Sequence, residues 1–196
     1  MYKINEIFFS LQGEGFHTGT PAVFVRFSGC NLQCAFCDTD HQDGKMMTPQ
    51  EIVDTVNQYP NAPMVVLTGG EPSLFIDDSF IDFLKQQTGK YLAIETNGTH
   101  PLPAGLDWVT LSPKSGFEGA TAASCILTGC DELKVVFCGQ DLAQYASIVA
   151  DHRFLQPCFD ENPVKCKANM DACVQAVLSN PGWRLSLQVH RLLGVR

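Results

Sequence analysis

The sequence is poor in the features that mark membrane proteins and nucleic-acid-binding proteins. Among its 196 residues, no run approaches the roughly 18 consecutive apolar residues that a membrane-spanning helix needs. Only 17% of the residues are charged, and 13 Lys and Arg stand against 21 Asp and Glu, which gives a formal net charge of -8. Contact with a phosphate backbone requires clustered basic side chains. We therefore expect neither a membrane nor a nucleic acid as a partner.

A signal for export is also lacking. The N-terminal segment MYKINEIFFSLQGEG has no basic stretch followed by a continuous apolar segment, so we expect a cytoplasmic protein. Disulfide frameworks are rare in that compartment. Cysteine is nevertheless abundant, with nine residues, three of which fall between positions 30 and 37. The sequence therefore favours metal binding or thiol chemistry.

Hydrophobic patterning indicates an α/β fold in a single domain that spans residues 1–196. Short runs rich in β-branched and aromatic residues are mostly continuously apolar, as strands covered on both faces are. Thr48 followed by Pro49 and Glu51 is typical of a helix start. The expected strands are 22–27, 64–68, 91–96, 108–111, 132–137, 154–157 and 185–189, and the expected helices are 49–59, 77–87, 142–150 and 170–178.

The alternation of strands and helices is incomplete. Residues 97–107 separate two expected strands but include two prolines and two glycines, which leaves no room for a crossover helix. The segment 113–131 is rich in Gly, Ala and Ser and has room for one poor helix at best. We therefore predict an open, partial barrel from which several crossover helices are missing.

Three cysteines have the spacing C-x-x-x-C-x-x-C, namely Cys30, Cys34 and Cys37. A loop that follows a strand can wrap three such thiolates around one metal centre. Structural zinc sites usually take four ligands from two separated C-x-x-C pairs, and the sequence has no second pair. A [4Fe-4S] cluster held by three cysteines leaves one iron open to a small-molecule ligand. A zinc site completed by His41 and three buried free cysteines are the alternatives.

This segment resembles the signature of the radical S-adenosylmethionine (SAM) superfamily, in which an aromatic residue, here Phe36, precedes the third cysteine. Thr-Gly-Gly-Glu-Pro at 68–72 follows an expected strand, as the glycine-rich motif of that superfamily does. The resemblance implies a partial TIM-like barrel of the radical SAM type and a [4Fe-4S] cluster on the three cysteines. It also implies that SAM binds through its amino group near Gly69, Gly70 and Glu71.

Polar residues after further expected strands extend this site. Side chains at the carboxyl ends of parallel barrel strands point into the mouth of a barrel. Taken singly, such residues are equally typical of helix caps and turns. The resemblance implies that the SAM site is lined by Glu95, Asn97, Ser112 and Lys114, with Gln156 on the adenine side.

The N-terminal segment narrows the resemblance to one family. Ser-Leu-Gln-Gly-Glu-Gly at 10–15 precedes the first expected barrel strand, which carries Arg26. Amide, carboxylate and guanidinium groups suit a polar heterocycle that bears a carboxylate. Together with the cysteine segment, this pattern is similar to the 7-carboxy-7-deazaguanine synthase family. The resemblance implies substrate contacts from Gln12, Gly13, Glu14 and Arg26.

The resemblance also implies a reaction. SAM would be cleaved to methionine and a 5'-deoxyadenosyl radical, which would abstract the C6 hydrogen of 6-carboxy-5,6,7,8-tetrahydropterin. Ring contraction and loss of ammonia, a lyase reaction, would give 7-carboxy-7-deazaguanine, a precursor of queuosine. Such an enzyme needs an external electron donor of the flavodoxin or ferredoxin kind.

A magnesium ion is the third implied cofactor. By resemblance, Thr39 is an Mg2+ ligand and Asp38 its neighbour, although both residues are equally typical of a cap after the cysteine loop. His190, after the last expected strand, is a further candidate for the site. A barrel that lacks helices exposes apolar faces, so we also expect a homodimer.

Other interpretations stay open at this point. A glycyl-radical enzyme activating protein shares the cluster and SAM, and a non-catalytic iron-sulfur sensor, an electron carrier or a zinc protein would use the cysteines alone. The remaining cysteines form no C-x-x-C pair and are typical of buried small hydrophobes, with an auxiliary cluster as the alternative. They are Cys125, Cys130, Cys138, Cys158, Cys166 and Cys173, of which Cys138 and Cys158 lie at the ends of apolar runs.

Overall fold

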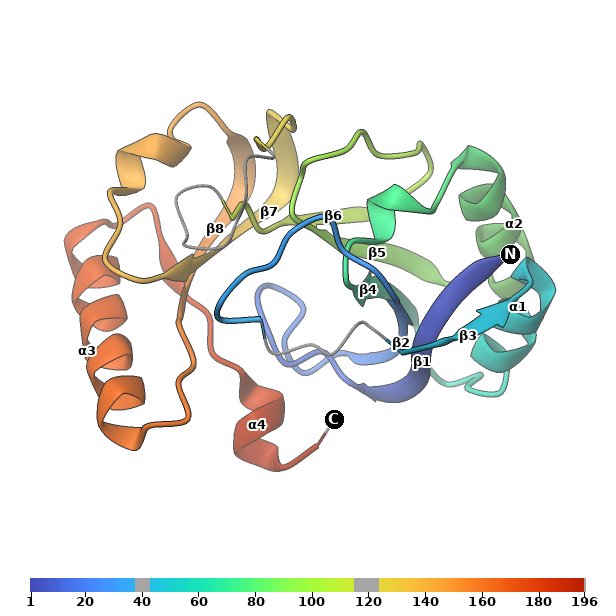
Figure 1. The fold of residues 1–196 in the computed structure, drawn as a ribbon, viewed down its shortest axis with the longest axis horizontal. Helices are drawn as coiled ribbons and strands as arrows, with labels where there is room; N and C mark the ends of the chain where they lie inside the picture. The colour runs from blue at the N-terminus through green and yellow to red at the C-terminus, as the bar shows by residue number, and fades with distance from the viewer. Residues whose placement is uncertain (38–42, 115–123, 196) are drawn as a thin grey trace.

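The computed structural model describes residues 1–37, 43–114 and 124–195. A strongly curved sheet forms the frame of this part of the chain (Figure 1), with nine strands in the order β3-β1-β2-β4-β5-β6-β7-β8-β9. Every neighbouring pair from β2 to β9 is parallel, whereas β1 is antiparallel to both β2 and β3. The strands are β1 (Tyr2–Leu11), β2 (Pro21–Phe27), β3 (Lys45–Met47), β4 (Met64–Gly69), β5 (Tyr91–Thr96), β6 (Trp108–Leu111), β7 (Gly129–Phe137), β8 (Val149–Pro157) and β9 (Arg184–Leu185).

In the described part of the chain, the α-helices α1, α2 and α3 lie against the two ends of the sheet (Figure 1). Helices α1 (Pro49–Val56) and α2 (Asp78–Thr88) lie at one end of the sheet. Helix α3 (Pro163–Ser179) lies at the other end, against β8 and β9. A short helix, α4 (Val189–Leu193), lies near the C-terminus at the open side of the barrel. Residues 97–107, between β5 and β6, contain no helix, as predicted. The architecture is therefore the predicted α/β partial barrel.

The first helix begins where the sequence predicts it. The Thr48 hydroxyl accepts a hydrogen bond from the Glu51 N–H at 3.2 Å, and the Glu51 carboxylate accepts one from the Thr48 N–H at 2.7 Å. This reciprocal capping box satisfies two backbone donors that a helix start otherwise leaves unpaired. It orients α1 so that Ile52, Val53 and Val56 are buried.

Apolar side chains fill both outer flanks of the sheet. One buried cluster joins α1 and α2 to β2, β4 and β5, and a second joins α3, through the buried Cys173, to β7 and β8. A third cluster, which includes Phe8, Phe24, Met64 and Val66, lies on the concave face of the sheet. This inner cluster closes the barrel below the site that the strand ends form.

The structure corrects two of the expected elements. The predicted helix at 142–150 is wrong: a single 3-10 turn, η2 (Leu142–Tyr145), is followed by β8, because the chain from Val149 onward pairs with β7. The predicted strand at 185–189 is also wrong beyond Leu185, since α4 starts at Val189. Strands β1 and β3 are absent from the predicted set. The predicted poor helix in 113–131 falls largely on residues outside the described ranges.

The described helices include none that is both long enough and apolar enough to cross a bilayer.

Candidate active site

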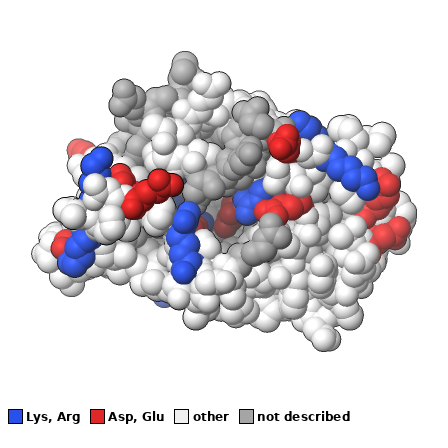
Figure 2. All heavy atoms as spheres, turned by 60° about the horizontal axis from the view of Figure 1, so that its bottom comes forward, with Lys and Arg blue, Asp and Glu red and all other residues white. Residues whose placement is uncertain are grey.

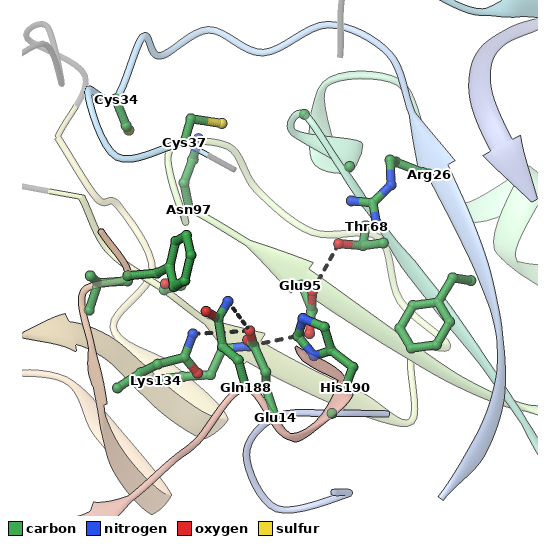
Figure 3. Close-up of a pocket in the computed structure, with 18 of the residues that line it drawn as sticks. Glu14, Arg26, Cys34, Cys37, Thr68, Glu95, Asn97, Lys134, Gln188 and His190 are labelled. Carbon is green, nitrogen blue, oxygen red and sulfur yellow. Dashed lines mark hydrogen bonds and ion pairs between the residues drawn. The ribbon is translucent and has the colours of Figure 1, made fainter. Parts of the chain in front are cut away.

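A cavity of about 780 Å³ opens at the carboxyl ends of the parallel strands. Figure 2 shows acidic and basic side chains close together around a hollow on this face. In Figure 3, Cys34 and Cys37 lie at one end of the cavity, and Glu14 lies with its partners at the other. The cavity brings together the predicted site residues Gln12, Gly13, Glu14, Arg26, Cys30, Cys34, Phe36, Cys37, Gly69, Gly70, Glu71, Glu95, Asn97, Ser112, Lys114, Gln156 and His190.

The alternation of side chains along the strands explains why these residues meet. Successive side chains of a strand point to opposite faces, so every second residue faces the barrel. Phe24 and Val66 belong to the inner apolar cluster, and two positions further along the same strands Arg26 and Thr68 line the cavity. These two residues are also register partners in β2 and β4. Strands β2 and β4 therefore each contribute an apolar residue below and a polar residue above.

The glycine-rich turn packs directly against the cysteine loop. The Gly70 N–H donates to the Phe27 carbonyl at 3.0 Å, and the Glu71 N–H donates to the Gly29 carbonyl at 2.9 Å. A Cβ atom on Gly70 would lie 1.9 Å from the Gly29 carbonyl oxygen, so no residue larger than glycine fits this contact. The two motifs that carry the radical SAM resemblance are thus one structural unit.

The carboxylate of Glu71 holds that unit to the end of β5. One oxygen accepts hydrogen bonds from the Ser73 hydroxyl at 2.6 Å and the Thr96 hydroxyl at 2.7 Å. The other accepts from the Asn97 N–H at 2.7 Å. Glu71 is buried and both of its oxygens have protein donors, so the side chain supports the turn.

Asn97 extends the same support to the cysteine loop. Its amide nitrogen donates to the Asn31 side-chain oxygen at 3.1 Å, and Asn31 in turn donates to the Thr99 hydroxyl at 2.9 Å. Asn31 lies directly after Cys30, so these bonds fix the position of the loop relative to β5. The sequence analysis did not identify Asn31.

The three thiols fit a soft metal centre in number and kind. All three line the cavity from one loop, and Cys30 Sγ accepts a hydrogen bond from the Leu32 N–H at 3.4 Å. Burial raises the pKa of the Cys30 and Cys34 thiols, with Lys114 acting in the opposite direction on Cys34, so both are protonated at neutral pH. A bound cation reverses this balance and takes thiolates as ligands. Three sulfur donors suit an iron-sulfur cluster with one open iron.

The thiols are not arranged as a finished metal site, however. Within residues 1–37, 43–114 and 124–195, no three His, Cys, Asp or Glu side chains are grouped closely enough to hold a metal ion. Ligation therefore requires side-chain rotation in the cysteine loop. His41, Thr39 and Asp38 lie outside the described residues, so the structure does not address the predicted Mg2+ ligands or the zinc alternative.

The opposite end of the cavity is built on an ion-pair network centred on Lys134. Its ammonium lies 2.5 Å from one Glu14 oxygen and 3.3 Å from a Glu95 oxygen. Glu14 also accepts hydrogen bonds from the Gln156 amide at 3.0 Å and the Gln188 amide at 2.9 Å. The carboxylates of Glu14 and Glu95 thus join five parts of the chain. These are the turn after β1, the strands β5, β7 and β8, and the segment before α4.

Glu95 has further hydrogen-bond partners on neighbouring elements. It accepts hydrogen bonds from the Thr68 hydroxyl at 2.8 Å and the Gln12 amide at 3.2 Å. Burial alone would raise the pKa of Glu95, but the charge of Lys134 and these hydrogen bonds lower the pKa below its ordinary value. Burial alone would lower the pKa of Lys134, and the charges of Glu14, Glu95 and Glu132 instead raise the pKa. Glu95 and Lys134 are therefore both ionised at neutral pH.

Lys134, Thr68 and Gln188 are not among the predicted site residues. A signal for Lys134 was present, because Glu132 and Lys134 are charged residues two apart in the run 132–137, whose other residues are apolar, so both face the barrel. Glu132 accepts a hydrogen bond from the Phe16 N–H at 2.9 Å, and burial raises the pKa of its carboxyl. No local pattern marks Gln188.

Gly13 and His190 are placed together. A Cβ atom on Gly13 would lie 2.2 Å from His190 Nδ1, and the Val189 N–H donates to the Gly13 carbonyl at 2.9 Å. The glycine therefore lets α4 approach the substrate-side turn. His190 reaches the cavity from this helix and not from the end of a strand.

The remaining predicted residues bring positive charge to the cavity wall. Arg26 donates from Nε to Glu6 at 3.0 Å, with its guanidinium carbon 5.7 Å from the Phe8 ring centroid. Lys114 donates to the Ser112 hydroxyl, and its ammonium lies 5.9 Å from the ring centroid of Phe36. Burial, followed by the charge of Lys134, lowers the pKa of Lys114. Arg26 and Lys114 therefore place a guanidinium and an amine on the cavity wall.

Comparison with known proteins places this site in a family. Residues 24–125 match the model of the radical SAM superfamily, which includes the cysteine loop and the glycine-rich turn. The chain is 56% identical over 196 residues to the 7-carboxy-7-deazaguanine synthase of Bacteroides thetaiotaomicron, with all of both chains covered. It is 40% identical to the synthase of Caulobacter vibrioides, with 99% of each chain covered.

A solved structure supports the same assignment. The crystal structure of QueE from Escherichia coli matches with a TM-score of 0.77 and 30% sequence identity, and the match covers 96% of this chain and 94% of that one. Full-length similarity of sequence and of fold confirms the resemblance that the motifs suggest. The chain belongs to the radical SAM superfamily and, within it, to the 7-carboxy-7-deazaguanine synthase family.

Proposed function

We propose that this chain converts 6-carboxy-5,6,7,8-tetrahydropterin to 7-carboxy-7-deazaguanine with loss of ammonia, as a carbon–nitrogen lyase of queuosine precursor biosynthesis. The observation that carries the proposal is the placement of the Glu14 carboxylate. Lys134, Gln156 and Gln188 hold it in the same cavity that the three thiols line. One cavity can thus place a polar heterocycle beside a radical-generating cofactor.

Glu14 provides the recognition of the ring. The pyrimidine edge of a pterin presents N–H donors, and an ionised carboxylate at a fixed position is the acceptor that suits them. Because Lys134, Gln156 and Gln188 hold the Glu14 carboxylate in a fixed position, that acceptor is already in place when the ligand arrives. Gln12, whose side-chain oxygen accepts from the Glu14 N–H at 3.1 Å, fixes the turn that carries Glu14.

Arg26 and a magnesium ion would receive the other end of the substrate. A pterin carboxylate brings negative charge into a half-buried cavity, where a guanidinium and a hard divalent cation both stabilise it. We assign the cation to Thr39, with Asp38 beside it, because a hydroxyl and a carboxylate are the oxygen ligands that Mg2+ prefers. His190, beside Gly13, completes the substrate side.

The cysteine end of the cavity is assigned to the cofactors. Cys30, Cys34 and Cys37 would hold a [4Fe-4S] cluster; cluster and SAM, when bound and reduced by an external flavodoxin-like or ferredoxin-like donor, supply the radical that removes a substrate hydrogen. The protein binds SAM, orients it and excludes water. The backbone of Gly69 and Gly70 would meet its amino group, beside the polar side chains of Glu95, Asn97, Ser112, Lys114 and Gln156, with the Phe36 ring next to the cluster.

The alternative functions given above do not require the ion-pair network of Glu14, Glu95 and Lys134. A glycyl-radical enzyme activating protein receives a protein backbone, which needs no carboxylate pair at the far end of the cavity. A sensor or an electron carrier needs no polar layer on six barrel strands. The network therefore favours a small heterocyclic substrate.

The test is product formation by the anaerobically reconstituted enzyme with SAM, a reductant and the carboxylated tetrahydropterin, followed by mass spectrometry of 7-carboxy-7-deazaguanine. Glu14→Gln removes the charge with little change in volume and should abolish most of the turnover while SAM affinity persists. Asp171→Asn, on the outer surface of α3, is the matched control and should have no effect. Absence of product from the wild type, with cluster and SAM cleavage intact, would overturn the proposal.

We also propose that residues 1–196 form one domain of a cytoplasmic homodimer. One sheet runs through the described part of the chain, and the large apolar residues Ile126 and Val149 are 54% and 73% exposed. Light scattering after size-exclusion chromatography tests the dimer.

A further inference from the structure

Two cysteines that the proposed reaction does not use lie side by side at the rim of the cavity. Cys138 and Cys158 directly follow β7 and β8, which are parallel neighbours, and the last register pair of these strands is Phe137 with Pro157. The two cysteines are therefore the next pair in register. Cys138 is exposed, and Cys158 is half-buried and lines the cavity.

The spacing of parallel strands suits a covalent link at this position. Neighbouring strands lie about 4.8 Å apart, and residues joined by a disulfide have Cα atoms roughly 4.4–6.8 Å apart. The two thiols also interact: the pKa of Cys138 is raised to about 12, first by burial and then by the charge and side-chain hydrogen bond of Cys158.

Hydrogen bonds hold the backbone of both residues. The Cys138 N–H donates to the Gln140 side-chain oxygen at 2.7 Å, and the Asn169 amide on α3 donates to the Cys158 carbonyl at 2.8 Å. The cysteines of the neighbouring helix are placed differently. Cys166 and Cys173 are on α3, and Cys173 is buried in the outer core.

We propose that Cys138 and Cys158 are a disulfide-forming modification site that reacts with small-molecule disulfides such as oxidised glutathione. In the first step, the thiolate of one cysteine attacks a glutathione sulfur, which forms a mixed disulfide and releases one glutathione as its thiolate. The second cysteine loses its proton to solvent and attacks the protein sulfur of the mixed disulfide, which releases the second glutathione. Two protein thiols are oxidised and one glutathione disulfide is reduced to two thiols.

The disulfide would link Cys158, which lines the cavity, to Cys138 in the loop after β7. Phe159, next to Cys158, lies 4.0 Å from the guanidinium carbon of Arg191 on α4. The oxidised form therefore fixes the segment between β8 and α3, on which the C-terminal helix rests.

The experiment uses the cluster-containing enzyme under anaerobic conditions, in glutathione buffers of graded composition, with cluster absorbance followed throughout. After thiols are blocked, trypsin cleaves at Lys134, Arg153 and Lys165, so peptides 135–153 and 154–165 each contain one cysteine, Cys138 or Cys158. We expect these two peptides to become linked. For a two-electron couple, an about hundredfold change in [GSH]²/[GSSG] should take the linked fraction from about one tenth to nine tenths.

Single variants test the pairing. Cys138→Ser and Cys158→Ser each leave a thiol without its resolving partner, so a glutathione adduct should accumulate on the remaining cysteine. Cys166→Ser, the matched control, should form the linked peptides as the wild type does. The proposal is overturned if the wild type stays unmodified at every glutathione ratio, or if it accumulates the same adducts as the single variants without linked peptides.

Discussion

Replacement of Lys134 by Met tests whether the ion-pair network at the cavity stabilises the folded chain. The side chains of Lys134, Glu14 and Glu95 are 8%, 15% and 25% exposed. Met keeps the length and apolar stem of Lys but leaves two adjacent carboxylates without their shared cation. Loss of one partner of a buried ion pair typically costs 3–5 kcal/mol, and because Glu95 is partly exposed we expect a loss near the lower end, about 3 kcal/mol, in the free energy of unfolding.

The matched control is Lys85→Met. Lys85 also lies 2.5 Å from a carboxylate, that of Asp107, but its side chain is 42% exposed, so solvent screens the pair and the cost should stay below about 1 kcal/mol. Urea unfolding of the cluster-free chains measures both values, since the cysteines lie at the other end of the cavity. The double variant Lys134→Met with Glu14→Gln removes one unpaired charge and should recover at least about 1 kcal/mol. Equal losses in both Lys variants, or strict additivity in the double variant, would refute the reasoning.

The pH dependence of this difference has a defined sign. The pKa of Glu95 is lowered in the folded chain, so its contribution to stability is present above the unfolded value of 4.5 and is lost as the pH falls through the folded pKa. In Lys134→Met the burial of Glu95 acts without the cation, so the pKa of Glu95 rises and protonation relieves the strain. The stability gap between wild type and variant should therefore shrink as the pH falls below 4.5, and a gap independent of pH would contradict the assignment.

Three further predictions concern the cofactors and the substrate. Cys30→Ala should abolish SAM cleavage while the free energy of unfolding changes by about 1 kcal/mol or less, because the loop is outside the core; stoichiometric zinc without iron-dependent absorbance in the wild type would exclude the cluster. Arg26→Ala should weaken substrate turnover far more than SAM affinity, and equal losses would mean that Arg26 serves the fold. Thr39→Ala should lower turnover and its response to added Mg2+ with the cluster spectrum unchanged; wild-type turnover that is indifferent to chelation of divalent ions would remove the metal assignment.

The sequence predicts the strands of this barrel and the cysteine end of its site because the signals there are local. Continuous apolar runs mark β2, β4 and β5, and the short proline-containing segment 97–107 excludes a helix. The predicted helix at 142–150 is wrong because the ladder between β7 and β8, a contact between distant residues, outweighs a helical pattern. Residues 186–188 depart from the expected strand because Ser186 donates to Gln156 at 3.0 Å and its segment turns into the cavity.

The substrate end of the site depends on contacts that no local pattern contains. Glu14 meets Lys134 across 120 positions of sequence and Gln188 across 174, and these meetings exist only because the sheet curves. One physical rule nevertheless narrows the search. A lysine in an otherwise apolar barrel strand must be paired, and Glu132, on the same strand, is engaged by the Phe16 N–H. The ion-pair partners of Lys134, Glu14 and Glu95, are residues that the motifs had already marked as ligand contacts. Glu14 and Glu95 thus serve the fold and the ligands with the same atoms, and for that reason stability and substrate affinity should change together in Lys134→Met.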